Sequence, residues 1–215
     1  MAIKKIKSIP LLEPNLVKAF GLETLYQPTP LLIEWLDVTG SLNEHEIFLL
    51  NQVHAKLIRH MNHWNEEELK MQFISMITLL AYFDDPINTY YDREISETIN
   101  DIFLSSKADM MLSKGIGELI EAPYFFLHEY KREKKYSGDP IGQMLGGMLI
   151  GQAINHNEKP IYGCYVQGRY WYFSILEGKK YVISKGFDAS EMDEAKLIIY
   201  ILRKLKTIIL ERLMD

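Results

Sequence analysis

The sequence lacks the features that mark secreted and membrane-spanning proteins. It has a single cysteine, Cys164, so no disulfide can form within the chain, and disulfide-free chains are typical of reducing compartments. No run of 18 or more apolar residues occurs, so neither a membrane span nor a membrane partner is expected. The basic start at residues 1–7 is not followed by the apolar segment of a secretory signal. These absences predict a cytoplasmic protein.

An excess of positive charge is absent as well. The formal net charge is −5 at pH 7, from 24 Lys and Arg against 29 Asp and Glu. The molecule as a whole therefore does not attract nucleic acid, and any phosphate-binding surface has to be a local patch. Candidates for contact with nucleic acid are Lys134 and Lys135, which follow a predicted strand, and Arg169, which lies between two predicted strands. A solvated surface is the simpler explanation of all three.

No linker, internal repeat or low-complexity segment divides the 215 residues, so we expect a single domain spanning residues 1–215. Four prolines interrupt residues 1–40, and we expect residues 1–64 to form a helical extension that wraps over the body. The body, residues 65–215, alternates predicted helices and strands. This order predicts an α/β or α+β fold with helices covering a mixed β-sheet.

Capping signals predict where the helices begin. Ser41 followed by Glu44 predicts a helix that ends near residues 62–64, Asn65 starts the next helix, and Ser190 followed by Asp193 starts the last one. A further helix from residue 140 to about 154 is unusual, because glycine destabilises a helix interior by about 1 kcal/mol against alanine. Its glycines at four-residue spacing predict a face that something approaches closely: Gly142, Gly146, Gly147 and Gly151.

Aromatic and β-branched residues predict strands at 107–113, 123–131, 161–167, 170–176 and 181–184. Residues 87–106 fit a strand or a short helix equally well. Successive side chains alternate between the faces of a strand, so Phe125, Leu127, Glu129 and Lys131 are expected on one face. An acid and an amine that continue an apolar row are costly unless they are paired, solvated in a cleft or bound to metal. This placement makes Glu129 and Lys131 candidates for chemistry.

A second acid is expected beside Glu129. If residues 107–113 and 123–131 form an antiparallel hairpin, the midpoint between Asp109 and Glu129 is residue 119, inside the expected loop. The two side chains would then lie about 5 Å apart, and bare carboxylates that close repel each other. A hard divalent cation removes the repulsion and prefers oxygen ligands, while Lys131 can stabilise a developing negative charge. This layout predicts metal-assisted hydrolysis.

The string Lys107-Ala-Asp109, a gap, Glu129-Tyr-Lys131 and a following helix that carries Gln143 resembles the PD-(D/E)XK nuclease superfamily, with its restriction-endonuclease-like fold. The likeness covers residues 65 to about 172, roughly half the chain, and the sequence also resembles a group of uncharacterised bacterial proteins assigned to this superfamily. It implies a nuclease core with a mixed β-sheet flanked by helices and an N-terminal helical extension. It also implies a Mg²⁺ (or Mn²⁺) cofactor and nucleic acid, with DNA expected, as substrate and partner.

The resemblance implies roles at one site for six residues. Metal binding is implied for Asp109, Glu129 and the backbone carbonyl of Tyr130, a place beside the attacking water for Lys131, contact with Lys131 or a phosphate for Gln143, and a further catalytic acid for Glu68. Glu68 and Gln143 also have structural explanations. Glu68 would complete a capping box with Asn65, and Gln143 is expected to be satisfied by nearby backbone.

Two alternatives to an enzyme stay open. Gly147 stands where related members carry a tyrosine four residues after the glutamine, and this departure and the net charge of −5 favour an inactive nuclease-fold module. Such a module would bind nucleic acid or a protein partner. A structural or regulatory subunit is the third possibility, with the glycine-bearing helix packed against a partner or a second copy in a homo-oligomer.

Overall fold

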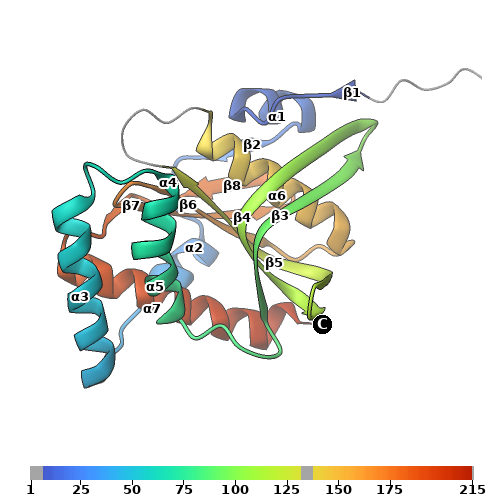
Figure 1. The fold of residues 1–215 in the computed structure, drawn as a ribbon. Helices are drawn as coiled ribbons and strands as arrows, with labels where there is room; N and C mark the ends of the chain where they lie inside the picture. Colours follow the sequence, from blue (N-terminus) through green and yellow to red (C-terminus); the bar gives the residue numbers. More distant parts are fainter. Residues whose placement is uncertain (1–6, 132–137, 215) are drawn as a thin grey trace, which may run out of the picture.

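The computed structural model describes residues 7–131 and 138–214, and within them a mixed sheet of nine strands forms the centre (Figure 1). The strands are β1 (Lys7–Ser8), β2 (Glu23–Leu25), β3 (Asn88–Ile99), β4 (Ile102–Ile116), β5 (Leu119–Lys131), β6 (Ile161–Gln167), β7 (Tyr170–Glu177), β8 (Lys180–Ile183) and β9 (Phe187–Asp188). Their spatial order is β1-β4-β5-β6-β7-β8-β2, with β3 paired to β4 and β9 paired to β7.

Helices cover both faces of this sheet, as expected for a mixed α/β protein (Figure 1). One face packs against α2 (Pro30–Leu36), α3 (Glu44–His60), α4 (Glu66–Leu69), the π-helix η1 (Lys70–Ile74), α5 (Ser75–Leu79), α7 (Met192–Ile208) and the π-helix η2 (Ile209–Leu213). The other face packs against α1 (Glu13–Phe20) and α6 (Pro140–Asn155). None of these helices, in the part of the chain that the structure describes, is long and apolar enough to cross a bilayer.

The two kinds of strand pairing divide the sheet. β3, β4 and β5 pair antiparallel with one another, and so do β6, β7 and β8, whereas β1 pairs parallel with β4 and β2 pairs parallel with β8. β5 and β6 are parallel, and α6 is the crossover that joins them. A parallel pair needs such a crossover because a tight turn cannot reverse the chain twice. Residues 87–106, which the sequence left undecided, are β3 and the start of β4.

Of the capping boxes predicted at Asn65, Ser41 and Ser190, the first is confirmed and the other two are wrong. Asn65 accepts from the backbone of Glu68 and the Glu68 carboxylate accepts from Asn65, which is the predicted capping box of α4. α3 instead begins after Asn43, which forms a capping box with Glu46, so the predicted start at Ser41 is two residues early. The α7 N-terminus has no side-chain cap, because the Ser190 hydroxyl donates to Asp188.

A bulge changes the faces of β5. The pairing with β4 shifts between Leu112 and Ser113, so β5 accommodates an additional residue at Phe125. Phe125 packs in the same core as Tyr130, although strict alternation would put them on opposite faces. The prediction that Phe125 shares a face with Glu129 is wrong for this reason.

The glycine face of α6 is approached closely, as predicted, and the approaching segment is the chain's own N-terminal extension. A Cβ added at Gly142 would lie 2.5 Å from the carbonyl oxygen of Leu11 and 2.6 Å from the nitrogen of Glu13. Asp139 fixes this contact, since one carboxylate oxygen caps Gly142 at 3.0 Å and the other accepts from the Glu13 N–H at 2.7 Å. Part of the face proposed for a partner is therefore occupied within the monomer.

Two substitutions on α6 test this packing. Gly142→Ala is expected to lower the free energy of unfolding by about 1–3 kcal/mol, because the new methyl meets backbone atoms that cannot rotate away. Gly146→Ala, one turn further along, meets only the Leu11 side chain and gains helix propensity, so it should be near neutral. Urea unfolding of both variants measures the difference; equal effects would contradict the close backbone approach.

Candidate functional site

The candidate site lies where β4 and β5 part. Their last adjoining pair in this direction is Met110 with His128. Beyond it, β4 continues beside β3 to the Ile102–Ile99 pair, whereas β5 continues beside β6 to Lys131. Asp109 and Glu129 are the next residues on the two diverging strands. The sequence-based prediction that these two acids lie across from each other fits this register.

Asp109 is held by contacts on both of its carboxylate oxygens. Oδ1 lies 2.6 Å from Nζ of Lys70, and Oδ2 accepts the backbone N–H of Tyr130 at 2.8 Å. The next carbonyl, that of Lys131, accepts from Gly168 on the β6 side at 2.7 Å. Peptide groups of successive strand residues point to opposite edges, so the Tyr130 carbonyl faces the β4 side, where Asp109 lies.

Glu129 and Lys131 form a buried ion pair on the face of β5 opposite Tyr130. Lys131 Nζ lies 2.5 Å from Glu129 Oε1, and the two residues are only 4 % and 8 % exposed. Glu129 is in register with Tyr165 of β6, which belongs to the core beside α6. An acid and an amine that continue a core-facing row are therefore paired with each other, which is one of the ways in which their burial becomes tolerable.

Burial and a second negative charge act together on Glu129. Burial, followed by the charge of Asp109, raises the pKa of Glu129 to about 7 against the opposing effect of the Lys131 ammonium. Burial lowers the pKa of Lys70, but the hydrogen bond and the charge of Asp109 outweigh it and raise that pKa. The two acids thus repel, and each has its own lysine as a counter-ion.

The segment formed by α4 and η1 brings further charges to Asp109 and Glu129. Two of its residues at this site, Glu66 and Lys70, were not predicted from the sequence. Lys70 opens the π-helical turn η1, a distortion that is frequent at functional sites. Glu66 lies 3.8 Å from both Lys70 and Lys131, and Glu67 lies 3.3 Å from Lys70. The predicted Glu68 points elsewhere: it is exposed, and its carboxylate accepts the N–H of Asn65 at 2.7 Å. Glu66, two residues earlier, occupies the place expected for Glu68.

The other predicted residues are not drawn into the cluster. Gln143 lies in the first turn of α6, and within residues 7–131 and 138–214 its buried Oε1 has no hydrogen-bond partner. The Arg169 guanidinium pairs with Asp188 at 3.1 Å and donates to the Tyr170 hydroxyl at 2.7 Å, so it supports the β6–β7 turn. Lys134 and Lys135 lie outside the described residues.

The donors at this site suit a hard divalent cation. The cluster comprises four carboxylates, of Glu66, Glu67, Asp109 and Glu129, against two lysine ammonium groups, so it retains negative charge. Among the described residues no group of three or more His, Cys, Asp or Glu side chains is close enough to hold a metal ion. Mg²⁺ commonly binds through one or two carboxylates and keeps several waters, so Asp109 with Glu129 is within its ligand range.

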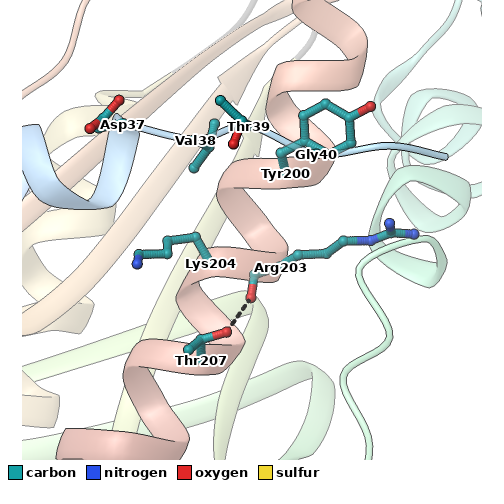
Figure 2. Close-up of a pocket in the computed structure, with 8 residues that line it drawn as sticks. All are labelled: Asp37, Val38, Thr39, Gly40, Tyr200, Arg203, Lys204 and Thr207. Atoms are coloured by element: carbon teal, nitrogen blue, oxygen red, sulfur yellow. Dashed lines mark hydrogen bonds between the residues drawn. The ribbon is translucent and has the colours of Figure 1, made fainter.

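A cleft of about 440 Å³ opens beside the cluster, between the α4–α5 segment and β3–β4, and both Asp109 and Lys70 line it. A second hollow of about 320 Å³ lies between the segment after α2 and α7 (Figure 2). Arg203 in that hollow turns away to Glu46 at 2.7 Å, and Gly40 packs on the Tyr200 ring. These contacts attach the N-terminal extension to α7. Of these two hollows, the first is the one that an acid of the pair lines, namely Asp109.

Titration of Glu129 makes the stability of the metal-free protein depend on pH. Its pKa is about 7 in the folded state and about 4.5 when unfolded, so between these values the folded protein keeps a proton that the unfolded chain releases. The contribution of Glu129 to the free energy of unfolding therefore falls by about 1–3 kcal/mol as pH rises through this window. Glu129→Gln should remove that fall.

Urea unfolding at pH 5 and pH 7.5, with chelator present, measures this slope for the wild type and Glu129→Gln. Glu118→Gln, in the exposed hairpin turn, is the matched control and should keep the wild-type slope. Identical slopes in all three proteins would contradict the buried, repelled state of Glu129.

Comparison with known proteins assigns no family to this geometry. No family model matches the chain, and no curated protein matches it. The function of the site therefore has to follow from the placement of its own residues, above all the acids of β4 and β5 and the two lysines that contact them.

Proposed function

We propose that this protein is a metal-dependent nuclease that hydrolyses phosphodiester bonds in nucleic acid, with DNA as the expected substrate. The observation that carries the proposal is the placement of Asp109 and Glu129 on diverging strands, with Lys131 2.5 Å from Glu129 and the Tyr130 carbonyl facing the Asp109 side. Buried, mutually repelling carboxylates beside a cleft are a frequent feature of catalytic sites.

The residues divide the work of hydrolysis between them. Asp109, Glu129 and the Tyr130 carbonyl would hold Mg²⁺ or Mn²⁺, which when bound supplies a Lewis acid and lowers the pKa of a coordinated water. The oxygen of water bonds to phosphorus, the bond to the leaving oxygen breaks, and that oxygen takes up a proton. Lys131, two residues after Glu129 on β5 and paired with it, stabilises the negative charge that develops on the phosphate.

The order of elements around the site supports the same proposal. An antiparallel hairpin, β4–β5, carries Asp109 and Glu129-Tyr-Lys131, α6 follows, and β6 returns parallel to β5. This arrangement is similar to the core expected of the restriction-endonuclease-like fold. α4, in the N-terminal part of the body, contributes Glu66, in keeping with the further acid that the resemblance implies.

Activity assays with single- and double-stranded DNA test the proposal directly. The wild type is expected to cleave DNA with Mg²⁺ or Mn²⁺ and to stop when chelator is added. Asp109→Asn should lower the cleavage rate at least about 100-fold, since it removes a charged ligand at the reacting centre. Asp193→Asn, on the exposed start of α7, is the control and should cleave like the wild type. Cleavage that persists in Asp109→Asn would remove this assignment.

Two substitutions on α4, Glu66→Ala and Glu68→Ala, test whether cleavage depends on the acid that faces the cluster or on any acid of this helix. Glu66→Ala should slow cleavage at least about tenfold, because Glu66 lies beside both lysines of the cluster. Glu68→Ala should leave cleavage near the wild-type rate and lower the free energy of unfolding by about 1 kcal/mol, because it breaks the capping box. Rates and urea unfolding of both variants decide the matter; a larger loss of activity in Glu68→Ala would mean that the exposed acid is the catalytic one.

One observation favours a second candidate, a binding module without catalysis. Each acid already has a lysine partner, with Lys70 on Asp109 and Lys131 on Glu129, and buried ion pairs of this kind also occur as purely structural networks. Metal-independent binding of DNA that Glu129→Ala leaves unaltered, together with the absence of cleavage, is the result that distinguishes this candidate from the nuclease.

A further inference from the structure

The cleft beside Asp109 has walls that the hydrolysis itself does not require. Met71 and Tyr91 are 67 % and 51 % exposed, and both line the cleft together with Ile74. The ring of buried Tyr130 also lines it, with Lys70 Nζ 5.8 Å from the ring centre. An apolar, partly aromatic surface is thus joined directly to the charged cluster.

The backbone of β3 is shaped around this cleft. Asp92 lies between two residues that pair regularly with β4, yet its own φ is +57°, in the left-handed region that few non-glycine residues adopt. The residue across from it on β4 is Asp109, by continuation of the same register. Asp92 is held at the rim by Lys107 at 2.8 Å. Strained backbone at a cleft is a recurrent feature of ligand-binding sites.

The rim of the cleft is acidic. Glu67 and Asp92 lie on opposite walls, and Asp109 lies at the inner end. Among the described residues that line the cleft, these three carboxylates outnumber the one ammonium, that of Lys70, so this lining keeps a net negative charge. Carboxylates accept hydrogen bonds from amino groups and repel phosphate, so the cleft suits a flat, uncharged group with amino donors better than an anion. Nucleobases with exocyclic amino groups have this chemistry, and stacking on tyrosine stabilises them regardless of sequence.

We infer that the cleft holds an unpaired nucleobase adjacent to the phosphate at the Asp109–Glu129 site, so that the substrate is single-stranded or contains an unpaired nucleotide. This inference rests on the proposed nuclease function for its substrate class. A paired base is stacked on both sides and cannot enter a cleft between a helix and a sheet unless it leaves the duplex. The site therefore selects against intact duplex.

Fluorescence of 2-aminopurine tests this inference. The probe is a single-stranded oligodeoxynucleotide with one 2-aminopurine, used alone, annealed to its complement, or replaced by an abasic site with an end label. Binding is measured with Ca²⁺, which takes oxygen ligands in place of Mg²⁺. The wild type should quench the probe on binding and bind the single strand at least tenfold tighter than the duplex or the abasic strand.

Substitutions locate the base. Tyr91→Ala should weaken binding of the single strand about tenfold and bring it close to that of the abasic strand, whereas Tyr91→Phe should keep the wild-type affinity. Met71→Ala, also at an exposed position, should likewise weaken binding of the single strand. Tyr26→Ala is the control, because Tyr26 is 89 % exposed and does not line the cleft.

The outcomes separate this inference from the proposed function. Metal-dependent cleavage that needs Asp109 but is unchanged in Tyr91→Ala, with equal affinity for single strand and duplex, overturns the base-binding cleft and leaves the nuclease intact. Tyr91-dependent quenching without cleavage in Mg²⁺ or Mn²⁺ supports the cleft and removes the nuclease. Absence of any binding overturns the cleft.

Discussion

The repulsion between two carboxylates in a poorly solvated place is the constraint on which the site depends. Glu129 is almost fully buried, and Asp109, on the neighbouring strand, adds a charge of the same sign. An unpaired charge in such a position is strongly destabilising, and like charges nearby increase the cost. Two ammonium groups offset this cost. Lys131, on the same strand as Glu129, pairs with Glu129, and Lys70, from a helix of the N-terminal half, pairs with Asp109. Sheet and helix are thus joined at this point by charge as well as by packing.

The divergence of β4 and β5 creates the room for this arrangement. While two strands stay paired, their peptide groups satisfy each other and leave no donor for a side chain. Once β4 follows β3 and β5 follows β6, the N–H of Tyr130 has no strand partner on its β4 side and donates to the Asp109 carboxylate instead. The bulge at Phe125 sets which side chains of β5 face each core before the fork is reached. Local irregularities of the sheet therefore position the acids.

Patterns that depend on neighbouring residues were predictable from the sequence. The placement of Asp109 level with Glu129 agrees with the predicted hairpin, although the turn closes at Ile116 and Leu119 and register shifts in β5 bring the two acids level. The close approach to the glycines of α6 follows from their cost in a helix. Contacts between distant segments were not predictable in this way. Nothing near Lys70 in the sequence indicates that it meets a residue 39 positions later, and the bulge that moves Phe125 to the other core has no simple sequence signal.

Glu66 and Glu68 make different contacts although they lie two residues apart in the first turn of the same helix. Three consecutive glutamates follow Asn65, and a helix turns about 100° per residue, so they point in different directions. The glutamate at the third position is the one that reaches back to the capping residue, and Glu68 does so. The capping box therefore identifies the acid that is engaged at the helix end, and leaves Glu66, one turn before Lys70, to face the sheet.

The ratio of carboxylates to lysines in the cluster indicates whether it serves stability or ligand binding. A network built only for stability is expected to match its charges, because each unmatched buried charge is costly. Here four carboxylates share two lysines, and the two acids with the least exposure are the pair that repels. Asp109 is the member of the repelling pair that lines the cleft. In the proposed nuclease, a divalent cation bound together with the substrate would balance the negative charge that the two lysines leave unmatched.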